Sequence, residues 1–224
     1  MQVHPDNKYA LENEGEFGKT EMWYVVDCEE GAQLIYGFKG KISKEEFEER
    51  IKNNTLDEVM NYVPVKKGDV FFIKSGTLHA IGKGILIAEI QQNSNTTYRV
   101  SDYGRLGADG KPRELHIQKA VDVTLTDKPN VPFGDVGEIK SYEYGTEREL
   151  AACEYFKTAK LNLDGEKEIN TENGFVSLLV LSGKITVKYS DGTVNAEKGG
   201  SIFIPQGLKV MLCGKAEVIC SEEN

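Results

Sequence analysis

A four-residue apolar run lies between two glycine-containing turns in Lys67-Gly68-Asp69-Val70-Phe71-Phe72-Ile73-Lys74-Ser75-Gly76. The same arrangement returns in Lys198-Gly199-Gly200-Ser201-Ile202-Phe203-Ile204-Pro205-Gln206-Gly207. A short apolar run bounded by turn residues is typical of a buried β-strand. The repeat therefore predicts two β modules, although a chance similarity between two hairpins would produce the same pattern.

Short runs rich in Val, Ile, Phe and Tyr recur along the whole chain, separated by turns that contain Gly, Asp or Asn. About nine short strands favour an all-β sandwich or barrel over a parallel α/β sheet. The strands are expected at residues 22–28, 33–38, 69–73, 84–91, 154–162, 176–181, 185–189, 201–204 and 216–220.

Residues 43–62 depart from the β pattern. Ser43-Lys44-Glu45-Glu46 and Thr55-Leu56-Asp57-Glu58 each match a capping box, so a helical insertion of two short helices is expected there. Two prolines and several polar turn residues over 126–134 suit a connector. We therefore expect a first module over residues 1–125, a connector over 126–150 and a C-terminal β module over 151–224.

The composition excludes several classes of protein. The 224 residues carry a formal net charge of −9, whereas nucleic-acid binding relies on clustered Lys and Arg, so nucleic acid is not an expected partner. No apolar run approaches the ~18 residues of a spanning helix, and the first residues do not resemble a signal peptide. We expect a cytoplasmic protein without a membrane partner. The four cysteines form no CxxC pair and are expected to be reduced.

Candidate metal ligands gather in the first module. Gln2 and His4 lie two residues apart, so on a strand they point to the same face. Glu21 opens one predicted strand, and His79 follows the turn after another. Two imidazoles, a carboxylate and an amide oxygen suit Zn²⁺, and Mn²⁺, Co²⁺ or Fe²⁺ as well. The alternative is that each histidine is an ordinary core or surface residue.

The second module has Val210 where His79 would fall, so only the first module is expected to hold a metal ion. His116, in Arg113-Glu114-Leu115-His116, is predicted to lie at a polar helix start and is left out of the site.

Six ordered motifs over roughly residues 2–105 resemble those of class I mannose-6-phosphate isomerase. They are Gln2-Val3-His4-Pro5-Asp6, Gly18-Lys19-Thr20-Glu21-Met22-Trp23-Tyr24, Lys67-Gly68-Asp69-Val70-Phe71-Phe72-Ile73, Gly76-Thr77-Leu78-His79-Ala80-Ile81-Gly82, Ala88-Glu89-Ile90-Gln91-Gln92 and Thr97-Tyr98-Arg99. The resemblance implies a cupin fold of the jelly-roll type. The C-terminal module fits the family's cupin-like second half in pattern more than in motif.

The resemblance also implies a site and a reaction. In the family, one catalytic Zn²⁺ is held by the positions that match Gln2, His4, Glu21 and His79. The positions that match Lys19, Glu89 and Arg99 line the same pocket. The implied reaction interconverts mannose 6-phosphate and fructose 6-phosphate by moving a proton between C2 and C1 through a cis-enediol. The expected partner is a small-molecule sugar phosphate, and the oligomeric state stays open.

The base that takes the proton from carbon has two candidates. Lys19 is two residues from a predicted ligand, and a nearby divalent cation would lower its pKa. Glu89 could act instead if it is buried. Arg99 offers a planar, permanently charged fork for the enediolate oxygens or the sugar phosphate. For Lys19 and Arg99 the alternative is an ordinary solvated charge.

Two departures from the family pattern leave other functions open. The chain reads Ser94-Asn95 where the family has a Ser-Asp pair, and the loss of that carboxylate would reduce activity. The family also has a sizeable segment ahead of the motif that starts at Gln2, so the resemblance implies that this chain lacks its N-terminal segment. One alternative is a catalytically impaired, truncated cupin that binds metal and sugar phosphate without turnover. Another is a cupin metalloenzyme of a different kind, such as an Fe²⁺ dioxygenase.

Overall fold

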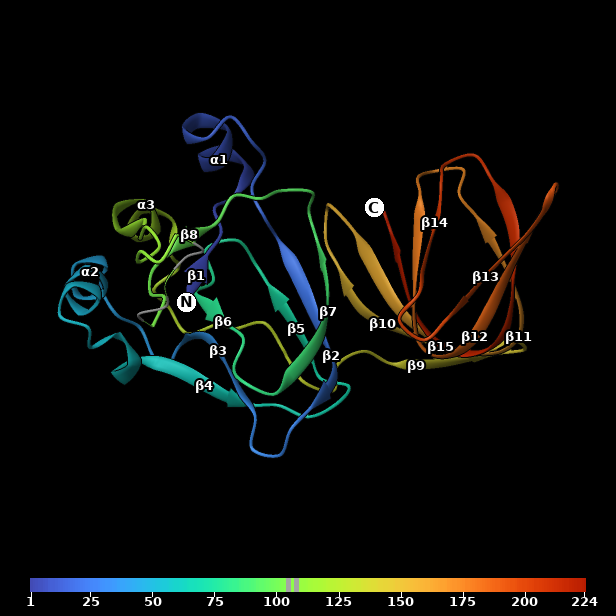
Figure 1. Cartoon of the computed structure of the whole chain (residues 1–224), viewed down its shortest axis with the longest axis horizontal. Coiled ribbons are helices and arrows are strands. Elements are labelled where there is room, and N and C mark those ends of the chain that lie inside the picture. The colour runs from blue at the N-terminus through green and yellow to red at the C-terminus, as the bar shows by residue number, and fades with distance from the viewer. Residues whose placement is uncertain (104–105, 107–108) are drawn as a thin grey trace. The chain divides into compact units, whose positions relative to one another are not determined.

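The chain forms two compact units, Met1–Asp135 (unit 1) and Val136–Asn224 (unit 2), in the computed structural model, which describes residues 1–103, 106 and 109–224 (Figure 1). Strands dominate both units, which confirms the all-β prediction. Among the described residues, no helix is both long enough and apolar enough to cross a membrane.

Two antiparallel sheets make up the β structure described in unit 1. One has the strand order β4-β3-β6-β1-β8 and the other β5-β2-β7. The bounds are β1 (Gln2–Val3), β2 (Glu21–Cys28), β3 (Gln33–Phe38), β4 (Met60–Pro64), β5 (Val70–Ile73), β6 (His79–Ala80), β7 (Ile85–Gln91) and β8 (Tyr98–Arg99). Strands β2, β3, β5 and β7 lie close to their predicted positions, whereas β1, β6 and β8 are too short for a periodic pattern to reveal.

The apolar residues of unit 1 pack on both faces of the five-stranded sheet. One cluster joins that sheet to the three-stranded sheet and includes Trp23, Tyr36 and Phe71. The other joins it to the helices and includes Phe38 and Phe47, whose rings meet edge to face at 5.6 Å. Because each large apolar side chain contributes roughly 1.5–3 kcal/mol when buried, these clusters hold the short strands in place.

The helices of unit 1 are α1 (Asn7–Asn13), α2 (Lys44–Lys52), the 3₁₀ helix η1 (Leu56–Glu58) and α3 (Ile117–Val123). The Ser43 hydroxyl caps α2 by accepting the Glu46 N–H at 3.1 Å, as the capping box predicted. The second predicted helix is present as η1, but its capping box does not form. Thr55 makes no side-chain cap, and the helix ends after three residues because the chain starts pairing with β3 at Met60.

Unit 2 is one antiparallel sheet with the order β13-β12-β15-β11-β10-β9, and β14 also pairs with β12 (Figure 1). The bounds are β9 (Ile139–Tyr142), β10 (Gly145–Ala152), β11 (Lys157–Asn170), β12 (Val176–Tyr189), β13 (Gly192–Glu197), β14 (Ser201–Ile204) and β15 (Lys209–Glu222). Buried and solvent-facing residues alternate along β12, so Val176, Leu178 and Val180 enter one apolar core.

The three central strands of unit 2 are longer than predicted. The turn expected near Ser182-Gly183 is a β-bulge, where the pairing of β12 with β15 shifts register and then continues. Gly183 has a φ of 77°, which other residues rarely adopt, and the bulge lets one strand span both predicted segments.

The repeated sequence adopts matching local structure in the two units. Gly68 and Gly76 flank β5 with φ values of 93° and 86°. Gly199 and Gly207 flank β14 with φ values of 83° and 87°. Each short strand is therefore bounded by left-handed glycines, as the Gly-strand-Gly pattern indicated.

The segment predicted as a connector contributes to both units. Phe133 stacks on Phe71 at a ring distance of 5.2 Å and Gly134 pairs with Val70 in unit 1, whereas β9 and β10 belong to the sheet of unit 2.

Candidate metal centre

Four predicted ligands come together from the two sheets of unit 1. Gln2 and His79 are opposite each other on β1 and β6, and Glu21 opens β2 in the three-stranded sheet. His4 follows directly after β1. Donor atoms of His4, Glu21 and His79 all lie within 4.8 Å of one another, and all three residues are buried. Residues far apart in the sequence thus form one compact group of metal-ligand types between the sheets.

A close backbone contact brings His4 to Glu21. The N–H of Lys19 donates to the carbonyl of Pro5 at 3.0 Å, which holds the entry to β2 against the exit from β1. Gly18 lies at this contact, and a Cβ there would come within 2.3 Å of the backbone of Asp6. Only glycine permits this approach without a shift of the main chain.

Both imidazoles are oriented by backbone carbonyls. His4 Nδ1 lies 2.9 Å from the Thr96 carbonyl, and His79 Nδ1 lies 2.8 Å from the Thr77 carbonyl. A carbonyl only accepts, so each Nδ1 carries the proton and each Nε2 keeps a lone pair. The Nε2 atoms of His4 and His79 lie 3.5 Å and 3.4 Å from the carboxylate oxygens of Glu21. The lone pairs and the carboxylate therefore converge on one point.

Burial keeps both imidazoles neutral. It lowers the pKa of His4 to about 4, with the charge of Lys19 acting in the same direction. It also holds the pKa of His79 well below its ordinary value. Burial raises the pKa of Glu21 to about 7, and the nearby Glu89 carboxylate adds to the rise. Neutral imidazole is the form that binds a metal ion.

The donor group fits a divalent cation. Within the described part of the chain, His4 Nε2 and Glu21 Oε1 are buried without a hydrogen-bond partner, which is costly unless something else satisfies them. The Gln2 amide lies 3.2 Å from His79 Nε2, and rotation of that amide by half a turn presents its oxygen instead. Two imidazoles, a carboxylate and an amide oxygen are ligands that Zn²⁺ and related metals accept.

Lys19 lies between two carboxylates next to this group. Its Nζ is 3.0 Å from Glu21 Oε2 and 3.1 Å from Glu89 Oε1. Burial lowers the pKa of Lys19, but the two carboxylates together outweigh that effect, so the pKa lies above its ordinary value. The carboxylates thus oppose the lowering that the sequence prediction expected from a nearby cation.

Glu89 is held in place from a second side. Its other oxygen accepts the indole N–H of Trp23 at 3.1 Å, and Trp23 and Glu89 are cross-strand partners on β2 and β7. The Glu89 side chain is 30% exposed, so it is less buried than the sequence prediction required of a base tuned by burial.

Arg99 extends a cross-strand row of site residues. Gln2 pairs with His79 on one side and with Arg99 on the other, so the three residues lie in line across β6, β1 and β8. All three line a cavity of about 180 Å³, whose wall also includes Trp23. Arg99 is therefore brought to the same cavity as two of the predicted ligands.

Two isomerases are similar to the chain over nearly its whole length. A mannose-6-phosphate isomerase of Bacillus subtilis (strain 168) is 40% identical over 223 residues, which are 99% of this chain and 70% of that protein. One from Streptococcus mutans is also 40% identical, over 227 residues, with 100% and 70% covered. The chain belongs to the mannose-6-phosphate isomerase family. The family model for the mannose-6-phosphate isomerase cupin domain matches residues 146–223, which lie in unit 2.

Solved structures of the family share the fold. The crystal structure of the mannose 6-phosphate isomerase from Bacillus subtilis matches 98% of this chain and 70% of its own length, with a TM-score of 0.88 and 39% identity. A phosphomannose isomerase from Salmonella typhimurium matches with a TM-score of 0.74 at 13% identity, covering 100% of this chain and 75% of its own, which supports the fold alone. Both comparisons confirm the cupin fold that the motifs indicated.

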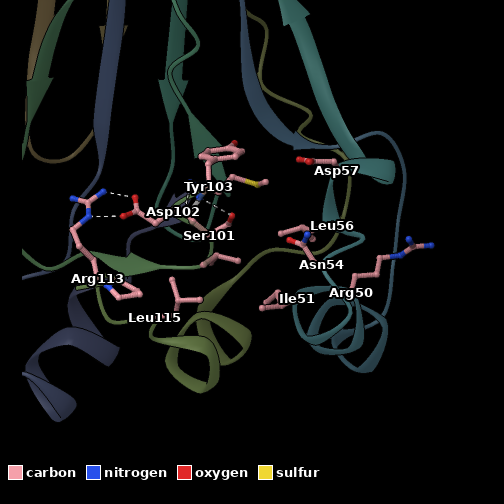
Figure 2. Close-up of a pocket in the computed structure, with 13 residues that line it drawn as sticks. Arg50, Ile51, Asn54, Leu56, Asp57, Ser101, Asp102, Tyr103, Arg113 and Leu115 are labelled. Atoms are coloured by element: carbon pink, nitrogen blue, oxygen red, sulfur yellow. Dashed lines mark hydrogen bonds and ion pairs between the residues drawn. The ribbon is translucent and has the colours of Figure 1, made fainter. Parts of the chain in front are cut away.

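A larger cavity of about 520 Å³ adjoins the first and shares part of its wall (Figure 2). Figure 2 shows two hydrogen bonds, drawn as dashed lines, between Arg113 and Asp102 at this shared wall. Arg113 Nε donates to Asp102 Oδ2 at 2.5 Å, and Nη2 donates to Oδ1. The pair fixes a guanidinium near the cavity that Arg99 lines.

Sequence reasoning missed several residues of the site. Trp23 is absent from the predicted site, although its spacing of two from Glu21 on a strand puts both side chains on the same face. His116 lies at a helix start, as the sequence predicts, but its side chain also contacts Arg99. The carbonyls of Thr77 and Thr96 carry no sequence signal, because any residue supplies a carbonyl.

Proposed function

We propose that this chain interconverts mannose 6-phosphate and fructose 6-phosphate, and that Gln2, His4, Glu21 and His79 hold one Zn²⁺ for the reaction. The observation that supports this most strongly is the convergence of three donor side chains within 4.8 Å. Family membership supplies the reaction, and the donor set favours the metal.

Bound at these four residues, Zn²⁺ would supply Lewis-acid polarisation of the sugar oxygens at C1 and C2. The protein's own contribution is to orient both imidazoles through the carbonyls of Thr77 and Thr96, so that both Nε2 lone pairs would be available to the ion. Burial excludes water from the ligands, since His4, Glu21 and His79 are each at most 1% exposed.

The proton moves between C2 and C1, and Glu89 and Lys19 share that task. Lys19 lies between two carboxylates, an arrangement that keeps a proton on its amine. Glu89 is therefore the better acceptor for the proton taken from carbon, and Lys19 the better group to hold or return a proton at the neighbouring oxygen. The indole of Trp23 keeps the Glu89 carboxylate in position.

Arg99 is the candidate for charge stabilisation. Its guanidinium donates to the carbonyl of Glu114 at 3.0 Å through Nη1, which leaves further N–H groups of the fork for an anionic oxygen. Those groups suit either the enediolate that forms during proton transfer or the phosphate of the sugar.

The test is a coupled assay for fructose 6-phosphate formed from mannose 6-phosphate, with added Zn²⁺. The control is the His79→Ala variant, and bound metal is measured in both proteins. Turnover that the variant lacks supports the proposal. Metal binding by the intact chain without turnover would instead favour a protein that binds metal and sugar phosphate but does not isomerise.

A further inference from the structure

Arg99 lies on β8, the edge strand of the five-stranded sheet. On its inner side β8 pairs with β1, where Gln2 is the partner of Arg99. An edge strand has no neighbour to fix its outer backbone groups, so its position depends on whatever else contacts it. The placement of Arg99 in the row with Gln2 and His79 therefore needs support from outside the sheet.

His116 supplies that support by completing the backbone pairing of Arg99. The N–H of Arg99 donates to His116 Nδ1 at 3.1 Å, and the N–H of His116 donates to the carbonyl of Arg99 at 2.8 Å. Residue 116 thus takes the place of a neighbouring strand, with its imidazole as the acceptor and its own amide as the donor. Because a backbone N–H only donates, Nδ1 carries the lone pair.

The same segment also holds the side chain of Arg99. The carbonyl of Glu114 accepts from Arg99 Nη1 at 3.0 Å. Three hydrogen bonds from residues 114–116 therefore fix both the main chain and the guanidinium of Arg99.

The segment rests on a well-anchored helix. The His116 carbonyl accepts the Ala120 N–H at 2.9 Å in the first turn of α3, and Ala120 is fully buried. Lys44 of α2 donates to the carbonyls of Asp122 and Thr124 at the other end of α3, at 3.0 Å and 2.7 Å. The imidazole is therefore attached to a fixed part of the core.

We propose that His116 is a positioning residue for Arg99, which holds Arg99 at the cavity that Gln2 and His79 also line. This inference rests on the proposed function, since the position of Arg99 affects turnover only if the chain is an isomerase. His116 does not touch the substrate in this account and acts through Arg99 alone.

Two substitutions separate the imidazole's hydrogen bond from its volume. His116→Phe keeps a ring against Tyr98, whose ring centroid lies 6.1 Å from that of His116, but offers no acceptor. His116→Asn has an amide oxygen bonded to Cγ, where the imidazole has Nδ1, so it restores the acceptor. We expect kcat/KM to fall about 10- to 100-fold in the first variant and to stay within about threefold of the wild type in the second.

A double-mutant cycle shows whether His116 acts through Arg99. In an Arg99→Ala background, followed at high enzyme concentration, His116→Phe is expected to cause no further loss, because there is no guanidinium left to position. An equal loss in both backgrounds would overturn the proposal, and so would wild-type kinetics in His116→Phe.

Backbone amide exchange measured by NMR provides a test that needs no substrate. The Arg99 amide should exchange at least about tenfold faster in His116→Phe and recover in His116→Asn. The Gly76 amide, which donates to the His4 carbonyl at 2.7 Å, is the control and should not change. Unchanged exchange at Arg99 would refute the positioning role. An inactive wild-type chain would refute the proposed function, while the exchange data would still decide whether His116 holds Arg99.

Discussion

Unit 1 and unit 2 share a local structure, but a group of buried polar residues lies beside it in unit 1 and an apolar core packs against it in unit 2. Both contain a short strand between left-handed glycines, but all three histidines of the chain lie in unit 1. Where His79 follows that strand in unit 1, unit 2 has Val210, which is buried in an apolar core. Unit 2 also has three paired strands of 14 residues each, whereas β1 and β6, which carry the predicted ligands Gln2 and His79, have two residues each.

The contrast between the two units indicates how the fold accommodates a group of buried polar side chains. The short strands β1 and β6 and the start of β2 place side chains from two sheets around one point, and buried polar groups there replace apolar packing. Such groups lower the stability of the metal-free unit, because desolvation is not fully offset. Unit 2 keeps a continuous apolar core and contributes stability without any of the predicted ligands.

The largest expected effect is the loss of turnover in Glu21→Gln. The amide keeps the volume of Glu21 but removes the charge that faces both imidazoles. Loss of several kcal/mol of charge stabilisation corresponds to a fall in kcat/KM on the order of 10³-fold. Glu147→Gln, which removes an ion-paired carboxylate from unit 2, is the control and should retain turnover within about twofold. Comparable losses in the two variants would remove the functional distinction between the units.

The next effect concerns the core of unit 2. Leu178 is fully buried there, so Leu178→Ala should lower the free energy of unfolding by about 2–5 kcal/mol. Chemical denaturation measures this loss, and a metal titration of the folded variant should match the wild type. Weaker metal binding in that variant would show that the two units are energetically coupled.

Added Zn²⁺ should stabilise unit 1 selectively. A ligand at 100 times its Kd stabilises the folded state by about 2.7 kcal/mol if it binds only that state. Amide hydrogen exchange resolves the two units separately, and slower exchange is expected around β1, β2 and β6. Equal slowing in unit 2 would contradict this prediction and indicate that the whole chain unfolds as one.

Metal affinity should depend on pH through Glu21. Its pKa is raised to about 7, so below that pH the metal must displace a proton, and above it the carboxylate is already free. Apparent affinity should therefore fall about tenfold for each pH unit below about 7 and level off above it. His4 contributes little in this range, since its pKa is lowered to about 4. Competition with a chelator at several pH values measures how apparent metal affinity changes with pH. This dependence should be weaker in Glu21→Gln.

Protonation of Glu21 and His4 also changes the folding stability of the metal-free chain with pH, in two opposite directions. The raised pKa of Glu21 makes its contribution to stability largest below about 4.5, and that contribution is lost as pH rises to about 7. The lowered pKa of His4 makes its contribution largest above about 6.5, and that contribution is lost as pH falls to about 4.

The smallest effect is at the helix caps of unit 1. Ser43→Ala removes the hydroxyl that accepts the Glu46 N–H, so it should cost about 1 kcal/mol of stability. Thr55→Ala is the matched control, because Thr55 makes no side-chain cap, and it should change stability by less than about 0.5 kcal/mol. Thermal unfolding of the two variants measures the difference, and equal melting temperatures would mean that the Ser43 cap contributes nothing.

Much of the fold followed from local patterns. Alternation of apolar residues and glycine turns predicted β2, β3, β5, β7 and β14 within a residue or so of their observed bounds. The pattern did not predict the length of β12, because Gly183 is as compatible with a bulge as with a turn until its partner strand is known. It also missed β9 and β13, whose largely exposed residues lack a buried face, and β10, whose residues are mostly half-buried.

The sequence by itself determined the fold class, the family and the set of residue types able to hold a metal, because these depend on composition, order and local spacing. Only the tertiary structure decided which atoms face one another. The Thr96 carbonyl that orients His4 lies 92 residues away in the sequence. Lys19 and Glu89 are separated by 70 residues, and Arg99 and His116 by 17. Such contacts arise from strand register and chain packing, which bring together residues that no local pattern connects.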